Sequence, residues 1–355
     1  MLKPQDYLVV ESRPLASPAL YHHELPLTET AAVLVTKTRD RIRNILYNED
    51  RRLLVIVGPC SVHDVDAALE YGQKLTALRE ELSDSLEIVM RVYFEKPRTN
   101  VGWKGLINDP HLDGSYDINT GLRLARRLLL DLAHLGLPAA TELLDPITPQ
   151  YIADVIAWTA IGARTTESQT HREMASGLSM PIGFKNNTDG SLLAAMNAMV
   201  AASRPHHFLG INHHGLASIV TTTGNPDGHL VLRGGKHGPN YDEASVQQAA
   251  EELAALGLNP RMMVDCSHAN SQKDHNQQIV VLENIAHQME SGARHILGAM
   301  VESHLVEGKQ PIPEDLTQLK YGQSITDACV SFDKTAEMLR KLATTIAPSL
   351  QISTK

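Results

Sequence analysis

The feature that most constrains the fold of this chain is a regular alternation of strand-like and helical patterns after residue 50. Short apolar runs rich in β-branched residues occur at residues 53–57, 86–94, 138–143, 159–163, 180–185, 229–233, 261–265 and 295–301. Most of these runs are separated by helical patterns, which occur at residues 67–82, 120–135, 149–157, 192–202, 244–256 and 277–290. Strand and helix alternating eight times predicts a parallel sheet, and eight such units close a (β/α)8 TIM barrel.

Segments at both ends of the chain lie outside this alternation. Residues 1–27 are rich in proline and predict an extended arm, and the residues from 28 onward predict an amphipathic helix of about five turns. After the last strand, residues 307–323 carry two prolines and little apolar content, which predicts a long loop. Residues 334–346 predict a final helix.

One segment interrupts the alternation. Two β-like runs at 207–212 and 216–222 flank a His-His-Gly turn and predict an inserted β-hairpin. We therefore expect an N-terminal arm and helix over residues 1–48. We expect the barrel to occupy residues 49–355 and to contain the hairpin at about 206–223.

Charge and cysteine spacing exclude several classes of protein. The net charge of -9 argues against a nucleic-acid partner, because proteins that bind nucleic acids usually present a basic face. No run approaches about 18 apolar residues, and the first residues lack a basic segment followed by an apolar core, so we expect a cytoplasmic protein without a membrane partner. Cys60, Cys266 and Cys329 show neither zinc-ribbon spacing nor a disulfide framework.

A charged or metal-binding side chain stands at or just after the end of every strand-like run. In a parallel barrel these ends meet at one face, so we expect the side chains to share a site. One set is cationic and consists of Arg91, Lys96, Arg98, Arg164, Lys185 and Arg233. So many positive charges repel each other unless anions offset them, which predicts substrates rich in phosphate and carboxylate. The alternative, that each cation pairs with a nearby carboxylate such as Glu142, stays open.

A second set combines different metal-binding groups and consists of Cys60, His268, Glu302 and Asp327. A thiolate, an imidazole and two carboxylates form a mixed soft and hard ligand set that suits a divalent transition metal. Two alternatives stay open. In the first, Cys60 is a core residue, Asp327 is a cap residue and only His268 is functional. In the second, Cys266 and not Cys60 provides the thiol ligand.

Several longer motifs resemble those of class I 3-deoxy-D-arabino-heptulosonate 7-phosphate (DAHP) synthases of the microbial, feedback-regulated type. The motifs are GPCSVHD, MRVYFEKPRTNVGWKGLINDP, IGARTTESQTHREMASGLSMPIGFKN, LRGGK, VDCSHANS, MVESHLVEG and YGQSITDAC. The likeness extends from about residue 51 to residue 329. It implies a metal-dependent condensation of phosphoenolpyruvate with D-erythrose 4-phosphate and water, which is the first step of the shikimate pathway.

The resemblance also implies roles for individual residues. The implied ligands for one divalent ion, which is manganese, iron, cobalt or zinc, are Cys60, His268, Glu302 and Asp327. The implied contacts to phosphoenolpyruvate are Arg91, Lys96, Arg164, Lys185 and Arg233, with Glu142 nearby. Gly162 and Ala163 are further implied substrate-binding residues. The implied contacts to erythrose 4-phosphate are Lys96, Pro97, Arg98 and Thr99. Lys96 and His268 are the candidates for the proton donor, and Cys60 joins them as a catalytic group.

Feedback inhibition by an aromatic amino acid is implied as well. The implied effector residues are Pro146, Pro149, Gln150, Leu178, Ser179, Phe208, Gly210 and Val220. Phenylalanine-regulated relatives tend to carry Met and Ser where this chain has Pro146 and Gly210, and glycine leaves space for a tyrosine hydroxyl, so tyrosine is the favoured effector. The resemblance further implies a homotetramer of paired dimers, with the arm and the hairpin in the contacts.

Two other functions remain as alternatives. A 3-deoxy-D-manno-octulosonate 8-phosphate synthase shares this fold and chemistry but uses a five-carbon sugar phosphate, whereas the KPRT stretch at 96–99 favours the four-carbon substrate. A non-catalytic barrel that binds aromatic amino acids is the other alternative. It is disfavoured because such a barrel is free to lose the metal ligands and the cations, and this chain retains them.

Overall fold

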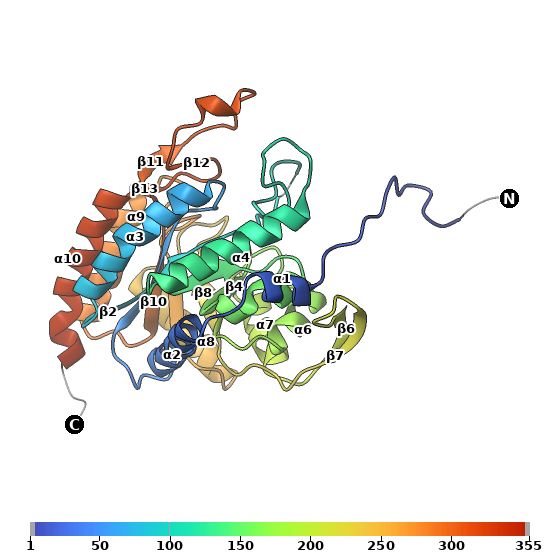
Figure 1. Cartoon of the computed structure of the whole chain (residues 1–355). Coiled ribbons are helices and arrows are strands. Elements are labelled where there is room, and N and C mark those ends of the chain that lie inside the picture. The colour runs from blue at the N-terminus through green and yellow to red at the C-terminus, as the bar shows by residue number, and fades with distance from the viewer. Residues whose placement is uncertain (1–3, 99, 352–355) are drawn as a thin grey trace.

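Eight parallel strands close into a barrel in the computed structural model, which describes residues 4–98 and 100–351 (Figure 1). The strands in spatial order are β1 (Leu53–Gly58), β2 (Leu86–Arg91), β3 (Ala139–Glu142), β4 (Trp158–Ile161), β5 (Ile182–Lys185), β8 (Gly228–Leu232), β9 (Met262–Asp265) and β10 (Ile296–His304). The barrel closes where β1 pairs with β10 in parallel, from Leu54 opposite Gly298 to Gly58 opposite Glu302. The predicted TIM barrel is confirmed.

Helices surround the barrel in the positions that the sequence indicated, with two differences. The confirmed helices are α3 (Val65–Glu81), α4 (Ile118–His134), α7 (Leu193–Ala202), α8 (Glu243–Ala255), α9 (Gln277–Glu290) and α10 (Phe332–Gln351). The helix predicted at 149–157 is instead α5 (Pro149–Ile152) followed by a 3-10 turn, Ala153–Val155. A further helix, α6 (Gln169–Ser176), was not predicted, because its buried residues are confined to its last three positions and give little apolar periodicity.

The prediction of an extended arm over residues 1–27 is wrong in part. Pro18–Glu24 forms helix α1, in which proline occupies the first turn and the Ser17 side chain caps the helix by accepting a hydrogen bond from Leu20 N. Residues 4–14 do extend away from the body (Figure 1). The loop predicted at 307–323 also contains structure, since β11 (Val306–Lys309) pairs with β12 (Gln323–Ser324). A short strand, β13 (Val330–Ser331), then extends the sheet beside β10.

The inserted hairpin is confirmed. Strands β6 (His207–Ile211) and β7 (Ala217–Thr221) pair antiparallel, apart from the barrel sheet. Gly215, with a φ of 76°, occupies the turn between them, where a left-handed conformation favours glycine. The predicted boundary at residue 48 stays a prediction. Among the described residues, no helix is long and apolar enough to cross a membrane, and the cytoplasmic location remains a prediction.

Helix α2 (Glu29–Leu46) closes the amino-terminal end of the barrel. Its residues Ile42, Ile45 and Leu46 belong to the same buried cluster as the side chains that fill the barrel interior, among them Trp158 and Met300. Their burial fixes the bottom of the core and leaves the opposite end open.

Polar contacts reinforce this closure. Arg261, just before β9, donates to the Ile45 carbonyl. Near the start of β2, the buried Glu87 forms ion pairs with Arg41 (2.9 Å), Arg52 (2.9 Å) and Arg79 (3.1 Å). The base of the barrel is therefore stabilised by the apolar side chains of α2, which form an apolar plug, and by the ion pairs of Glu87.

Replacing Ile45, which is fully buried, by Ala is expected to lower the free energy of unfolding by about 2 to 5 kcal/mol, because the change leaves a cavity at the barrel base. Urea unfolding followed by circular dichroism measures this loss. Val33→Ala on the same helix is the matched control, since Val33 is 45% exposed and its change should stay within about 0.5 kcal/mol. Equal losses in the two variants would contradict the plug.

Candidate active site and metal centre

A pocket of about 320 Å³ opens at the carboxyl ends of the strands. Its lining contains most of the residues that the sequence singled out, namely Arg91, Lys96, Pro97, Arg98, Glu142, Ala163, Arg164, Lys185, Arg233, His268 and Asp327. Thr99 lies outside the described residues. Gly162 does not line the pocket, but a Cβ there would collide with the Glu142 carboxylate, so glycine permits Glu142 to occupy its place. Cys60 and Glu302 are fully buried.

Further pocket residues were missed by the sequence analysis. They are Asn100, Val101, Thr188, Ser267, Ser271, Lys273, His275, Lys309, Thr326 and Ala328. Lys273 and Lys309 add two more positive charges to the rim. The sequence analysis missed these two lysines because it considered only the first charged residues after each strand. Lys273 lies two residues after the VDCSHANS motif.

Three of the four predicted metal ligands converge. One donor atom each of Cys60, Glu302 and Asp327 lies within 4.8 Å of the other two. They come from the loop after β1, from β10 and from the loop before β13. A sulfur atom with two carboxylate oxygens fits a divalent transition metal. The sequence left Cys266 open as a competitor, and Cys60 is the thiol in this group.

His268 lies beside this group rather than within it. Its Nε2 is 4.0 Å from Glu302 Oε1, and its Nδ1 is 2.9 Å from Asp265 Oδ2. The Asp265 carboxylate is fully buried, and although burial opposes its charge, His268 and Lys185 hold the pKa of Asp265 well below its usual range. A carboxylate on one ring nitrogen orients the other nitrogen toward Glu302, as in many metal sites. The ligand role of His268 stays a prediction.

Glu302 is fixed by contacts on both its side chain and its backbone. Arg91 Nη2 donates to Oε1 at 2.9 Å and Ser267 Oγ donates to Oε2 at 2.7 Å. The amide side chain of Gln278 in α9 donates to the Glu302 carbonyl (3.0 Å) and accepts from its N–H (2.8 Å). Burial opposes ionisation, but His268, Arg91 and Lys96 lower the pKa of Glu302 to about 2. The carboxylate is therefore charged and held in place.

The cations divide into paired and unpaired members. Arg91 is fully buried against Glu302 and stacks over the Tyr93 ring at 3.4 Å. Lys185 Nζ is 3.5 Å from both the Glu142 and the Asp265 carboxylates. The alternative of local pairing therefore holds for Arg91 and Lys185. Their positive charges are already partly neutralised by carboxylates.

Arg164 and Arg233 are different. Neither forms an ion pair with a carboxylate within residues 4–98 and 100–351, and Arg233 Nη1 donates only to the neighbouring Gly234 carbonyl at 3.2 Å. Burial lowers the pKa of Arg233 and the charge of Arg164 lowers it too, while the carboxylates of Asp265, Asp327 and Glu142 act in the opposite direction. Two guanidinium groups that repel each other at the pocket wall can bind a phosphate or carboxylate, since an anion offsets this repulsion.

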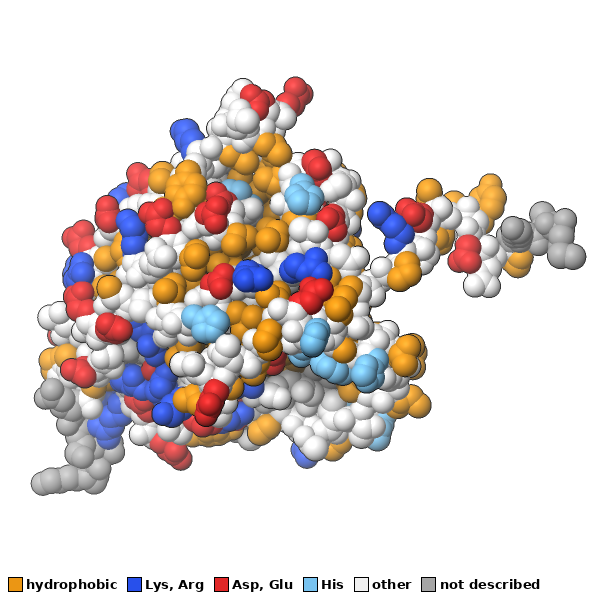
Figure 2. Space-filling view, viewed as in Figure 1, with side chains coloured by type: hydrophobic (Ala, Val, Ile, Leu, Met, Phe, Trp, Pro, Cys, Tyr) orange, Lys and Arg blue, Asp and Glu red, His pale blue; other side chains and the backbone are white. Residues whose placement is uncertain are grey.

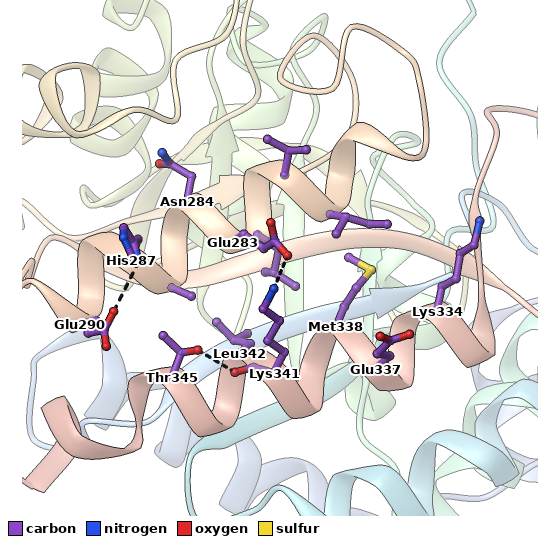
Figure 3. A pocket seen from close by; sticks show the side chains of 14 residues that line it. Glu283, Asn284, His287, Glu290, Lys334, Glu337, Met338, Lys341, Leu342 and Thr345 are labelled. Carbon is purple, nitrogen blue, oxygen red and sulfur yellow. Dashed lines mark hydrogen bonds and ion pairs between the residues drawn. The ribbon is translucent and has the colours of Figure 1, made fainter.

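A cavity of greater volume lies elsewhere and lacks this chemistry. It has a volume of about 770 Å³ and lies between α9 and α10 on the outside of the barrel (Figure 3). Two pairs of its polar side chains lie close together, Lys341 with Glu283 at 2.6 Å and His287 with Glu290 at 3.4 Å. The smaller pocket, where unpaired cations meet metal-binding groups, is therefore the candidate active site.

The predicted effector residues fall in two neighbouring regions. Phe208 and Val220 pair across the hairpin, and a Cβ on Gly210 would lie 2.8 Å from Val220 Cγ2. Asn225, just beyond the hairpin, donates to the Leu178 carbonyl at 2.8 Å, and Ser179 follows directly in the chain. Pro149 and Gln150 are in α5, and Pro146 is in the loop before it.

Helix α1 connects these two regions. Ala19 N–H donates to the His213 carbonyl in the hairpin turn at 2.8 Å. Just before the same helix, the Ala16 carbonyl accepts a hydrogen bond from the Tyr151 hydroxyl of α5 at 2.9 Å. The arm therefore contacts both regions, while their shared effector role stays a prediction.

Comparisons with known proteins agree with these features. The sequence model of the DAHP synthetase I family matches residues 26–340. The Tyr-sensitive phospho-2-dehydro-3-deoxyheptonate aldolase of Escherichia coli is 54% identical over 334 residues, which are 94% of each chain. The Phe-sensitive enzyme of the same organism is 54% identical over 341 residues, covering 96% of this chain and 97% of the relative. The structure of the Francisella tularensis enzyme superimposes with a TM-score of 0.93 at 50% identity, covering 96% and 98%.

Cobalt(II) added to the protein is expected to produce sulfur-to-metal charge-transfer absorption in the near ultraviolet, because Cys60 belongs to the donor group. Cys60→Ala should lose this absorption and bind cobalt(II) more weakly than the wild type. Cys266→Ala, which removes another fully buried thiol, should keep both the absorption and the affinity. Absorption that survives in Cys60→Ala would exclude Cys60 as a ligand.

The same titration should depend on pH. Burial, together with the charge of Glu302, raises the pKa of the Cys60 thiol. The thiol must therefore lose a proton when a metal binds, and apparent affinity should rise by about tenfold per pH unit below that pKa.

Proposed function

The chain belongs to the DAHP synthetase I family and is a 3-deoxy-7-phosphoheptulonate synthase, and we propose that the pocket at the carboxyl ends of its strands is the active site. The reaction joins phosphoenolpyruvate, D-erythrose 4-phosphate and water to give DAHP and phosphate. It is the first step of the shikimate pathway. The observation that carries the proposal is the meeting of unpaired Arg164 and Arg233 with the group of Cys60, Glu302 and Asp327 in and beneath one pocket.

We propose that one divalent ion, manganese, iron, cobalt or zinc, is held by Cys60, His268, Glu302 and Asp327. Members of this family are generally metal-dependent. When bound, such an ion supplies Lewis-acid polarisation of the aldehyde oxygen of erythrose 4-phosphate. The chain supplies a charged Glu302 and a histidine oriented by Asp265.

The cations are proposed to bind and orient both substrates. Arg164 and Arg233 are assigned to phosphoenolpyruvate because neither forms an ion pair among the described residues, and Lys185 and Glu142 pair with each other in the same pocket. Lys96, Pro97, Arg98 and Thr99 are assigned to erythrose 4-phosphate. Two phosphorylated substrates repel each other in water, so a cationic pocket contributes to rate by holding them together and offsetting this repulsion.

Lys96 is proposed as the proton donor, with His268 as the other candidate. Its Nζ lies 3.2 Å from Cys60 Sγ, next to the proposed metal position. Burial opposes its charge, but Cys60, Glu302 and Glu142 outweigh that effect and raise the pKa of Lys96, so the ammonium keeps its proton. Carbon–carbon bond formation leaves an alkoxide that this proton can neutralise. Water then attacks the second carbon of the former phosphoenolpyruvate before phosphate leaves.

Regulation and assembly are proposed from the arm and the hairpin. The arm exposes Tyr7 (86%), Leu8 (88%) and Val10 (102%), and the hairpin exposes Leu209 (88%) and Ile219 (79%). Figure 2 shows apolar side chains along the projecting arm. Exposed apolar groups of this kind favour association of subunits, which supports the proposed homotetramer of paired dimers. Relatives include Tyr-sensitive and Phe-sensitive enzymes, and of the two effectors tyrosine is the one proposed for this chain.

Arg164→Ala is expected to raise KM for phosphoenolpyruvate by roughly 10- to 150-fold, because a charge-assisted contact of about 1.5 to 3 kcal/mol is lost. A steady-state assay of phosphoenolpyruvate consumption measures it, with and without chelator. Arg340→Ala is the control, since Arg340 is exposed on α10 and pairs with Glu81. An unchanged KM in Arg164→Ala would contradict the assignment, and turnover with arabinose 5-phosphate instead would contradict the four-carbon substrate.

The same assay across tyrosine, phenylalanine and tryptophan should show inhibition by tyrosine. Gly210→Ser should weaken this inhibition, because the added atoms crowd Val220. Its activity without effector should stay at the wild-type value, which separates the effect from misfolding. Inhibition by phenylalanine and none by tyrosine would reverse the effector assignment.

A further inference from the structure

We propose that Glu95 is a positioning residue that ties the substrate-binding segment 96–98 to the loop after β3, residues 143–148, so that this loop sets the position of Lys96. The inference rests on the proposed function of the pocket. Glu95 itself is 3% exposed and does not line that pocket. It therefore acts through its neighbours and not through substrate.

The carboxylate of Glu95 accepts three hydrogen bonds, all from one loop. Leu144 N–H donates to Oε2 at 3.3 Å, Asp145 N–H donates to Oε1 at 3.2 Å, and the Thr148 hydroxyl donates to Oε1 at 3.3 Å. The next side chain, Lys96, lies 3.2 Å from Cys60 Sγ. In an extended segment consecutive side chains point in opposite directions, so Glu95 faces the loop while Lys96 faces the reaction site.

The backbone hydrogen bonds on either side of Glu95 are local. Lys96 N–H donates to the Lys104 carbonyl at 2.8 Å, and Ile107 N–H donates to the Phe94 carbonyl at 3.4 Å. These two bonds connect the segment to the chain that follows it, whereas the Lys96 ammonium contacts Cys60 in the site. Glu95 is thus a buried side-chain link from the segment to the neighbouring strand-to-helix unit.

The far end of the 143–148 loop leads to the proposed effector region. The loop contains Pro146 and continues into α5, which begins at Pro149. His171 of α6 holds the loop from its other side through a hydrogen bond of 2.7 Å between its Nε2 and the Leu144 carbonyl. A ligand that shifts Pro146 and Pro149 would therefore move the three donors of Glu95, and with them Lys96.

The charge state of Glu95 supports this role. Burial raises the pKa of Glu95 to about 8, and the charge of Asp145 on the loop raises it as well, against the hydrogen bonds from Leu144, Asp145 and Thr148. The carboxyl group thus ionises slightly above neutral pH. Hydrogen bonds to an ionised acceptor are about twice as strong, so the link should tighten as pH rises through about 8.

The test compares steady-state kinetics of the metal-loaded full chain with those of Glu95→Gln, Glu95→Ala and Thr148→Val. We expect KM for erythrose 4-phosphate to rise about tenfold in Glu95→Gln, more in Glu95→Ala and less in Thr148→Val. KM for phosphoenolpyruvate should rise less than KM for erythrose 4-phosphate, because Arg164, Lys185 and Arg233 come from other strand-to-helix units. The ratio of variant to wild-type KM for erythrose 4-phosphate should grow between pH 7 and 9.

Glu87→Gln is the matched control. Glu87 is also a buried glutamate of the β2 segment, but it lies at the base of the barrel with three arginines. This variant should unfold at a lower temperature and keep both KM values. A Glu95→Gln enzyme with both values within twofold of wild type, or with equal rises in both, would overturn the positioning role. If Glu95→Ala fails to fold, Glu95→Gln and Thr148→Val still decide.

The link to regulation has a separate readout. Calorimetry with tyrosine should show similar affinity in wild type and in Glu95→Gln, while inhibition of turnover should be several-fold weaker in the variant. Unchanged inhibition would overturn the link to the effector region. A wild-type enzyme that tyrosine does not inhibit would overturn the proposed effector but leave the KM comparison intact. Absence of wild-type turnover would overturn the proposed function itself.

Discussion

The ion pair between Arg91 and Glu302 is the interaction on which the arrangement of the site depends. Both side chains are fully buried and their atoms approach to 2.9 Å. Removing either partner would leave an unpaired charge in the barrel, which costs several kcal/mol. Arg91 belongs to the cationic set and Glu302 to the proposed metal-binding set. The two sets are thus joined at their deepest point, and each keeps the other in its charged form.

The other cations of the pocket differ in how fully nearby anionic groups offset their charge. Lys185 is shared by two carboxylates, Lys96 lies against the Cys60 thiol, and Arg164 and Arg233 lack an ion pair among the described residues. The protein as a whole carries a net charge of -9, so this positive region is local. An acidic surface with a basic pocket favours small anions that can enter the pocket and bind the guanidinium groups that lack an ion pair.

Much of the fold and site followed from residue pattern, and the exceptions have physical causes. The run at 86–94 was predicted as one strand, but β2 ends at Arg91, and the next residues remain buried while turning toward the pocket. Helix α6 was missed because a short helix with few buried residues has little periodicity. The role of Asp265 was missed because the sequence analysis took His268 as the functional group at the end of this strand. Only the structure shows that the Asp265 carboxylate contacts both Lys185 and His268.

The sequence by itself determined the eight-unit barrel, the hairpin and the two chemical sets, because strand and helix periods and strand-end residues are local properties of the chain. Only the tertiary structure decided which cations are neutralised and which are free, that Cys60 and not Cys266 joins the carboxylates, and that Glu95 faces a neighbouring loop. Those outcomes depend on distances between residues far apart in the chain. Such distances follow from closure of the barrel and not from spacing along the sequence.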